Sequence, residues 1–96
     1  MAAGTPPALS REFVIVNKRG LHARASARFV ETVSGFDAVI EVEKDGVTVG
    51  GTSIMGLMML AASPGCSIAV HGRGPDAAAA LDALEELVSS GFGEDS

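Results

Sequence analysis

The sequence contains no tryptophan and no tyrosine, and its four phenylalanines are its only large aromatic residues. Proteins that bind single-stranded nucleic acid stack the bases on aromatic side chains. The formal net charge is −5, which disfavours binding to a phosphate backbone. Both properties argue against a nucleic-acid-binding protein.

Cysteine is also scarce. The single Cys66 cannot form an internal disulfide, which is typical of a protein from a reducing cytoplasm. No stretch is long and apolar enough to span a membrane, and the first residues lack the basic start and apolar centre of a secretory signal. We expect a cytoplasmic protein that does not contact membranes. Nothing in the sequence indicates an oligomer, so we expect a monomer.

The length of 96 residues suits one domain. Residues 1–10 carry Gly4, Pro6 and Pro7 among small residues, and we predict a disordered tail there. The folded domain is expected over residues 11–90. Residues 91–96 are rich in glycine and acidic side chains, and they are predicted to be a frayed C-terminal tail.

The first half of the domain shows one helical pattern between extended segments. Arg11 to Asn17 is almost continuously apolar, which predicts a strand in the centre of a sheet. A helix is predicted from about His22 to Ser34, with Gly35 as its C-terminal cap. Alternating apolar residues over 38–43 and 47–49 flank a tight-turn dipeptide, which indicates a β-hairpin.

The second half adds a short helix, a strand and a longer helix. The short helix is predicted over about Ser53 to Ala61, with Ser53 or Thr52 as its N-cap. A fourth strand follows over residues 66–71, and Asp76 is expected to cap a third helix. The order β-α-β-β-α-β-α predicts an α+β fold, an open-faced β-sandwich with three helices on one face of a four-stranded antiparallel sheet.

Charge is distributed unevenly along the chain. Residues 1–30 hold five basic side chains and one acidic side chain, whereas residues 31–96 hold two basic and eleven acidic ones. The positive charge gathers around His22, and it would steer an acidic or phosphorylated partner there. The alternative is an ordinary solvated helix face on which Arg28 pairs with Glu31.

His22 is predicted at or beside the first residue of a helix. The first backbone N–H groups of a helix have no intrahelical partner, and the helix dipole adds partial positive charge. This environment favours neutral imidazole, whose lone pair a nucleophile needs. Arg24 lies in the first turn, so the pattern indicates a site for an anion beside a nucleophile. The alternative is that His22 only begins the helix.

Two other features could carry chemistry. His71 is the last residue of the predicted fourth strand, and we interpret it as a surface histidine without a role. A metal site shared by His22 and His71 is the less favoured alternative, because no carboxylate or thiol motif accompanies them. The short helix is apolar almost all round, so we expect Met55 and Ile54 to be exposed as a docking patch, although all of its apolar residues could instead be core.

Two motifs carry a family resemblance. Gly20-Leu21-His22-Ala23-Arg24, followed by Ala25 and Ser26, resembles the phosphohistidine motif of HPr, the phosphocarrier of the bacterial phosphoenolpyruvate-dependent phosphotransferase system. Ser53-Ile54-Met55-Gly56-Leu57-Met58 resembles a second motif of that family. The resemblance covers about Arg11 to Ser90. It implies the strand order β1-β4-β2-β3, which the sequence pattern alone does not give.

The resemblance also implies a function. Enzyme I, charged from phosphoenolpyruvate, would phosphorylate Nδ1 of His22, and the group would pass to a histidine of an enzyme IIA domain. Arg24 and the backbone amides of Ala23 and Arg24 would stabilise the phosphoryl group, and Ile54, Met55 and Arg28 would contact the partners. Such a carrier needs no metal or cofactor and is not a free-standing enzyme. It serves sugar uptake or a regulatory branch of the system.

Two residues raise further questions within this resemblance. Ser53 matches the serine that HPr kinase/phosphorylase phosphorylates in some bacteria, although Thr52 replaces the usual preceding residue. Ala25 stands where proline is commoner, which predicts a slightly looser site. The alternative function, from a different class, is a regulatory module that binds a small anionic ligand reversibly at the helix start.

Overall fold

The computed structural model describes residues 8–94. The elements, in chain order, are β1 (Leu9–Val14), α1 (Ala23–Ser34), β2 (Val39–Lys44), β3 (Val47–Gly50), α2 (Ile54–Met59), β4 (Ser67–Arg73), α3 (Ala77–Ser89) and the 3₁₀ turn η1 (Gly91–Gly93). The predicted order of strands and helices is confirmed.

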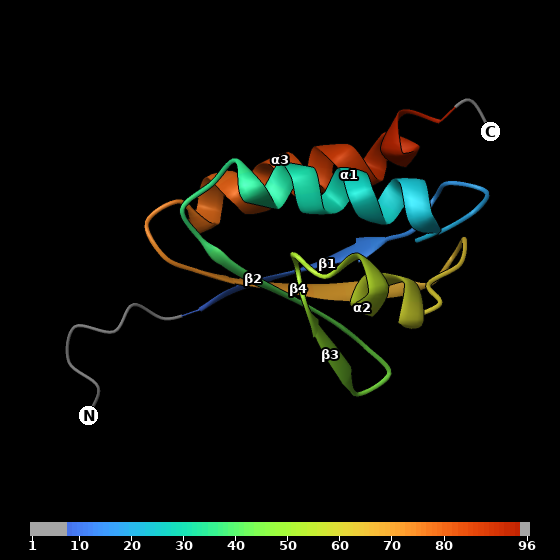
Figure 1. Ribbon diagram of the computed structural model, residues 1–96, viewed down its shortest axis with the longest axis horizontal. Helices are drawn as coiled ribbons and strands as arrows, with labels where there is room; N and C mark the ends of the chain where they lie inside the picture. The colour runs from blue at the N-terminus through green and yellow to red at the C-terminus, as the bar shows by residue number, and fades with distance from the viewer. Residues whose placement is uncertain (1–7, 95–96) are drawn as a thin grey trace.

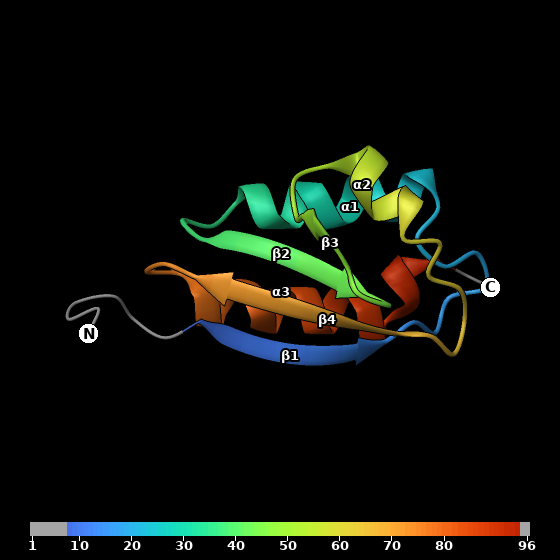
Figure 2. The ribbon, with the colours of Figure 1, turned by 90° about the horizontal axis from the view of Figure 1, so that it is seen from below.

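The four strands form one antiparallel sheet in the order β1-β4-β2-β3. Helices α1 and α3 cover one face of this sheet (Figure 1), and the opposite face is bare (Figure 2). Alternation explains the arrangement: in β4, Ile68 and Val70 are buried under the helices, whereas Ser67 points to the bare face and is exposed. The predicted open-faced α+β sandwich is therefore confirmed.

The first strand lies at an edge of the sheet, so its predicted central position is wrong. It also begins at Leu9 and ends at Val14, earlier than the expected Arg11 to Asn17. Phe13 is buried, but Val14 is 51% exposed on the bare face. The apolar run of β1 suggested that both faces of the strand are buried. Only one face is buried, and the other exposes apolar side chains on the bare side of the sheet.

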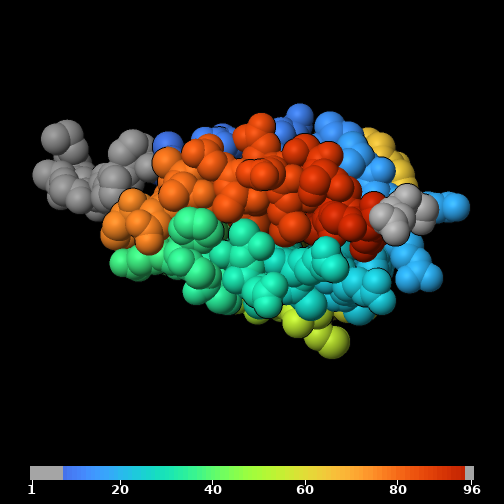
Figure 3. Space-filling model, turned by 90° about the horizontal axis from the view of Figure 1, so that it is seen from above, coloured from blue at the N-terminus to red at the C-terminus, as the bar shows by residue number. Residues whose placement is uncertain are grey.

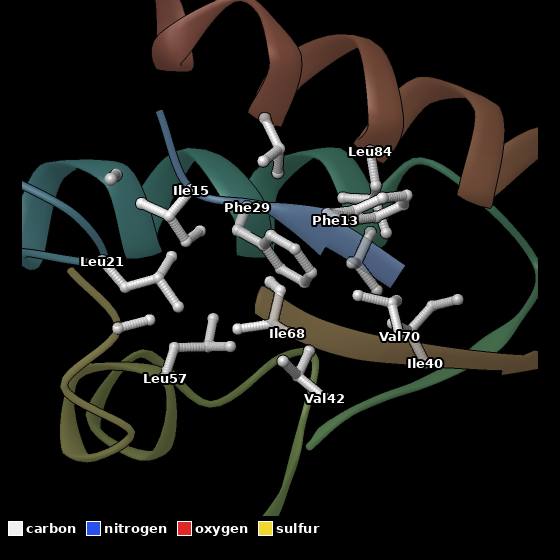
Figure 4. Packing of buried hydrophobic residues seen from close by; sticks show 14 of the residues in the cluster. Phe13, Ile15, Leu21, Phe29, Ile40, Val42, Leu57, Ile68, Val70 and Leu84 are labelled. Carbon is white, nitrogen blue, oxygen red and sulfur yellow. The ribbon is translucent and has the colours of Figure 1, made fainter. Parts of the chain in front are cut away.

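The core fills the space between the helices and the sheet (Figure 4). Phe29 of α1 and Leu57 of α2 are fully buried in it. Helix α3 contributes a buried stripe along its length, which consists of Ala77, Ala80, Leu81, Leu84 and Val88.

The C-terminal segment is folded at residues where a frayed tail was expected. Gly91, Phe92 and Gly93 all have left-handed backbone angles, with φ of 68°, 58° and 70°, and Phe92 is fully buried in the core. The sequence pattern suggested fraying because of its glycines, but these residues turn the chain so that Phe92 reaches the core. Residues 1–7 and 95–96 of the two expected tails lie outside the described residues.

Two loop predictions have different outcomes. Asp45 and Gly46 both have positive φ, 52° and 81°, as the predicted tight hairpin requires. Asp76 precedes α3 but its side chain does not cap the helix. Its carboxylate instead accepts a 2.8 Å hydrogen bond from the backbone N–H of Asp37, and this bond ties the loop after α1 to the start of α3. Over residues 8–94, no helix is long and apolar enough to cross a membrane.

Candidate functional site

The loop before α1 has a fixed backbone. Gly20 has φ of 60°, and a Cβ atom there would lie 2.0 Å from the carbonyl oxygen of Ala62. The next residue, Leu21, donates a 3.0 Å backbone hydrogen bond to the same oxygen. Only glycine allows this close approach, so Gly20 sets the position from which His22 enters the helix.

His22 is the N-cap residue of α1, as predicted. Its backbone is extended, and its carbonyl oxygen accepts the first helical bond, from Ser26 N–H at 2.8 Å. No side chain caps this helix start. The amides of Ala23 and Arg24 precede the first helical bond, so they remain available to an anion beside the ring of His22.

The imidazole of His22 is held by a residue from the other end of the chain. Its Nε2 lies 2.6 Å from Oε2 of Glu94, and Asn17 Nδ2 donates a 3.1 Å hydrogen bond to Oε1 of the same carboxylate. Asn17 is buried, and its Nδ2 also donates to the carbonyl oxygen of Gly20 over 2.8 Å. These bonds join the C-terminal segment, the loop and the histidine into one cluster.

The charge state of Glu94 decides which ring nitrogen can react. The hydrogen bond from His22 lowers the pKa of Glu94, and so do, to smaller extents, the hydrogen bond from Asn17 and the positive charge of Arg24. An ionised carboxylate only accepts hydrogen bonds, so Nε2 of His22 carries the hydrogen that it shares with Glu94. Nδ1 has no hydrogen-bond partner among residues 8–94, which leaves it as the candidate nucleophile.

Two arginines of α1 have different roles in the structure. Arg24 is exposed, and no hydrogen bond or ion pair engages its side chain within the described part of the chain. Arg28 donates a 2.6 Å hydrogen bond from Nη1 to the carbonyl oxygen of Phe92, and among the ion pairs of residues 8–94 none joins it to Glu31. Arg24 is thus available to an anion at the helix start, whereas Arg28 holds the C-terminal turn.

The short helix α2 packs next to α1 (Figures 1 and 2). The predicted N-cap is confirmed, because Ser53 Oγ accepts a 3.0 Å hydrogen bond from the backbone N–H of Gly56. Met55 is 72% exposed, Ile54 is 40% exposed, and Leu57 is fully buried. The expected exposure of Ile54 and Met55 is confirmed, and α2 presents an apolar patch that also includes Met58 and Met59.

His71 lies apart from this site. It is on the bare face of the sheet, where Nδ1 lies 2.6 Å from Ser10 Oγ and Nε2 lies 3.1 Å from Oε1 of Glu43. Within residues 8–94 no group of three metal-binding side chains comes together, and His22 and His71 share no site. The metal alternative has no support in the described geometry.

Sequence reasoning missed Asn17 and Glu94. Glu94 contacts the ring of His22, and Asn17 donates a hydrogen bond to Glu94. Asn17 was assigned to the end of a strand, and Glu94 to a frayed tail. One signal was present: Phe92 is a lone aromatic residue in an otherwise polar segment, and a large apolar side chain is usually anchored in a core.

The fold and the site together define a small open-faced α+β sandwich that presents one histidine at an uncapped helix start. A family model described as the phosphorylation site of the HPr component of the phosphotransferase system matches residues 9–90. The phosphocarrier protein HPr of Neisseria meningitidis serogroup A is 48% identical over 86 residues, which is 90% of this chain and 97% of that protein.

Two further comparisons agree. The phosphocarrier protein HPr of Cupriavidus necator is 43% identical over 86 residues, covering 90% of this chain and 97% of that protein. A crystal structure of HPr from Thermoanaerobacter tengcongensis is similar with a TM-score of 0.87 and 43% identity, covering 92% of this chain and 99% of that one. The chain belongs to the HPr family of phosphocarriers of the phosphotransferase system.

Proposed function

We propose that the protein carries a phosphoryl group on Nδ1 of His22, taken from phosphorylated Enzyme I and passed to a histidine of an enzyme IIA domain. The observation that supports this most directly is the arrangement of the ring. Glu94 holds Nε2 at 2.6 Å, Nδ1 has no partner among residues 8–94, and the residue that carries the ring is the N-cap of α1, whose start no side chain caps.

Each transfer exchanges one N–P bond for another. The lone pair of Nδ1 attacks the phosphorus atom, and the N–P bond to the Enzyme I histidine breaks with its electron pair returning to that nitrogen. The amides of Ala23 and Arg24 and the guanidinium of Arg24 stabilise the charge on the transferring oxygens. The second transfer reverses the roles, so the protein is regenerated and acts as a relay. These steps require no metal or cofactor bound to this chain.

The partners would dock on the surface formed by α2 and the exposed side of α1. The apolar patch of α2 centres on Ile54 and Met55, and Met55 is largely exposed. Methionine-rich surfaces adapt to more than one partner, which suits a carrier that binds Enzyme I and enzyme IIA in turn. Arg28 is an exposed residue of α1 that would add positive charge for the partners, while its Nη1 donates to the carbonyl oxygen of Phe92.

Ser53 would be a regulatory phosphorylation site for HPr kinase/phosphorylase. Its side chain caps α2, directly beside the docking patch. A phosphate there would add close to two negative charges, which would weaken docking of an acidic Enzyme I surface and slow phosphorylation of His22. The cellular setting that fits this chemistry is the cytoplasm, in sugar uptake or in a regulatory branch of the phosphotransferase system.

Intact-mass analysis after incubation with Enzyme I, phosphoenolpyruvate and magnesium tests the proposal. We expect one acid-labile phosphoryl adduct on the parent and on His71→Ala, which removes the other histidine, and none on His22→Ala. If the parent forms no adduct while Enzyme I phosphorylates a control carrier, the proposal is wrong. The reversible anion-binding module would then be the better interpretation of the helix start.

A further inference from the structure

The contact between Glu94 and His22 joins residues that are 72 positions apart in the chain. From this geometry we propose that Glu94 is a positioning residue for phosphoryl transfer, which keeps the hydrogen of His22 on Nε2 and the lone pair on Nδ1. The inference rests on the proposed function of His22. It assigns a task to the C-terminal segment, which lies outside the two sequence motifs.

The carboxylate of Glu94 is fixed at both of its oxygens. Oε2 contacts His22 Nε2 at 2.6 Å, and Oε1 accepts the 3.1 Å bond from Asn17 Nδ2. Asn17 cannot reorient easily, because it is buried and the same nitrogen donates to the Gly20 carbonyl oxygen. The Glu94 side chain is only 12% exposed, so the bond to the ring is shielded from water.

The backbone of the C-terminal segment is shaped to deliver this carboxylate. Three consecutive residues, Gly91, Phe92 and Gly93, adopt left-handed angles, which is unusual for phenylalanine. Burial of Phe92 and the bond from Arg28 to its carbonyl oxygen hold this turn in place. Figure 3 shows the C-terminal end of the described chain, in red, lying against α1. The turn is thus anchored at both its side chain and its backbone, and this anchoring fixes the position of the next residue, Glu94.

The proposed role follows from where the proton stays during transfer. When the N–P bond forms at Nδ1, the hydrogen remains on Nε2, and the ring takes a formal positive charge beside the carboxylate of Glu94. The phosphorylated ring is then a good leaving group, because the electrons of the N–P bond return to a nitrogen of a protonated ring. Without Glu94, no carboxylate would hold the hydrogen on Nε2 or face the positive ring, and the onward transfer would slow.

The first test needs neither Enzyme I nor phosphate. Imidazole ¹⁵N chemical shifts of the unphosphorylated protein report which ring nitrogen carries the hydrogen. We expect the Nε2–H form to dominate in the parent and in Glu86→Gln, which removes an equal charge from an exposed position on α3. In Glu94→Gln we expect a mixture of both tautomers. Equal tautomer populations in Glu94→Gln and the parent would overturn the inference.

The second test measures transfer from Enzyme I and to an enzyme IIA domain. Loss of a charge-assisted hydrogen bond predicts a rate lower by roughly ten- to a hundredfold in Glu94→Gln, with KM for Enzyme I unchanged because Glu94 is recessed. Glu86→Gln should match the parent. A normal rate, or a defect confined to KM, would overturn the inference alone. Absence of any adduct on the parent would overturn the proposed function as well.

Discussion

The guanidinium of Arg28 on α1 donates a hydrogen bond of 2.6 Å to the carbonyl oxygen of Phe92, 64 residues later in the chain. This bond spans from the functional helix to the turn that carries Glu94. We expect Arg28 to contact the partners, and this bond shows that it also has a structural role. The same bond stabilises Phe92 in a left-handed conformation, with φ of 58°.

Phe92 should therefore contribute strongly to stability. Its side chain is fully buried, so Phe92→Ala should lower the free energy of unfolding by about 3–5 kcal/mol, through lost burial and a residual cavity. Urea denaturation measures this change. Met59→Ala, at a side chain that is 77% exposed, is the control and should change stability by less than about 0.5 kcal/mol. A Phe92→Ala variant as stable as the control would show that the turn is not anchored.

Gly20 and Gly46 form a matched pair for testing the loop before α1. Both have positive φ, 60° and 81°, but a Cβ at Gly20 would meet the Ala62 carbonyl oxygen, whereas a Cβ at Gly46 would meet no atom within 4 Å. Gly46→Ala should cost about 1 kcal/mol from its backbone angle alone. Gly20→Ala should cost a further ~1–3 kcal/mol, because two backbones must move apart.

Denaturation midpoints of these two variants give the comparison. The Gly20→Ala variant should also show shifted NMR signals for His22, since the loop positions that residue. Equal stability losses in the two variants would mean that the contact with Ala62 relaxes without cost.

Ser53→Asp tests the regulatory proposal while it keeps the helix cap. Aspartate and asparagine both accept the N-cap hydrogen bond that Ser53 accepts from Gly56, so Ser53→Asn is a control that differs only in charge. We expect KM for Enzyme I to rise roughly two- to fivefold in Ser53→Asp, the size of one surface charge interaction, and to stay unchanged in Ser53→Asn. Equal KM values for the two variants would contradict the regulatory role.

The lowered pKa of Glu94 predicts a stability that depends on pH. A carboxyl group whose pKa is lower in the folded than in the unfolded protein stabilises the fold above the unfolded value, 4.5, and loses this contribution as the pH falls through the folded pKa. The parent should thus be more stable than Glu94→Gln at pH 6. The difference should shrink progressively below pH 4.5. Urea titrations across this range measure it, and a difference that grew toward low pH would contradict the assignment.

Local signals predicted most of the helix starts. His22 and Ser53 begin helices as expected, because caps and turns depend on residues close together in the sequence. The edge position of β1 was not predicted, since an apolar run does not reveal whether one or both faces of a strand are covered. The strand order itself came from the family resemblance and is confirmed.

The contacts of Asn17 and Glu94 are of another kind. They join a loop and a C-terminal segment that are 77 positions apart in the chain. Neither residue belongs to a local sequence pattern, so the sequence does not indicate that Asn17 and Glu94 are in contact. Phe92 was the one residue from which the fold of this segment could have been predicted, because burial of its side chain in the core also brings the residues next to it close to the folded domain.

The position of the C-terminal segment affects how this protein can be handled in experiments. Glu94 lies against His22, whereas β1 begins at the opposite end of the sheet (Figure 1). A bulky group attached directly behind Glu94 would therefore stand next to the ring of His22 and, under the proposed function, would compete with its partners for space. The same group attached directly ahead of Leu9 would stand at the far end of the sheet, which makes the start of β1 the better attachment point.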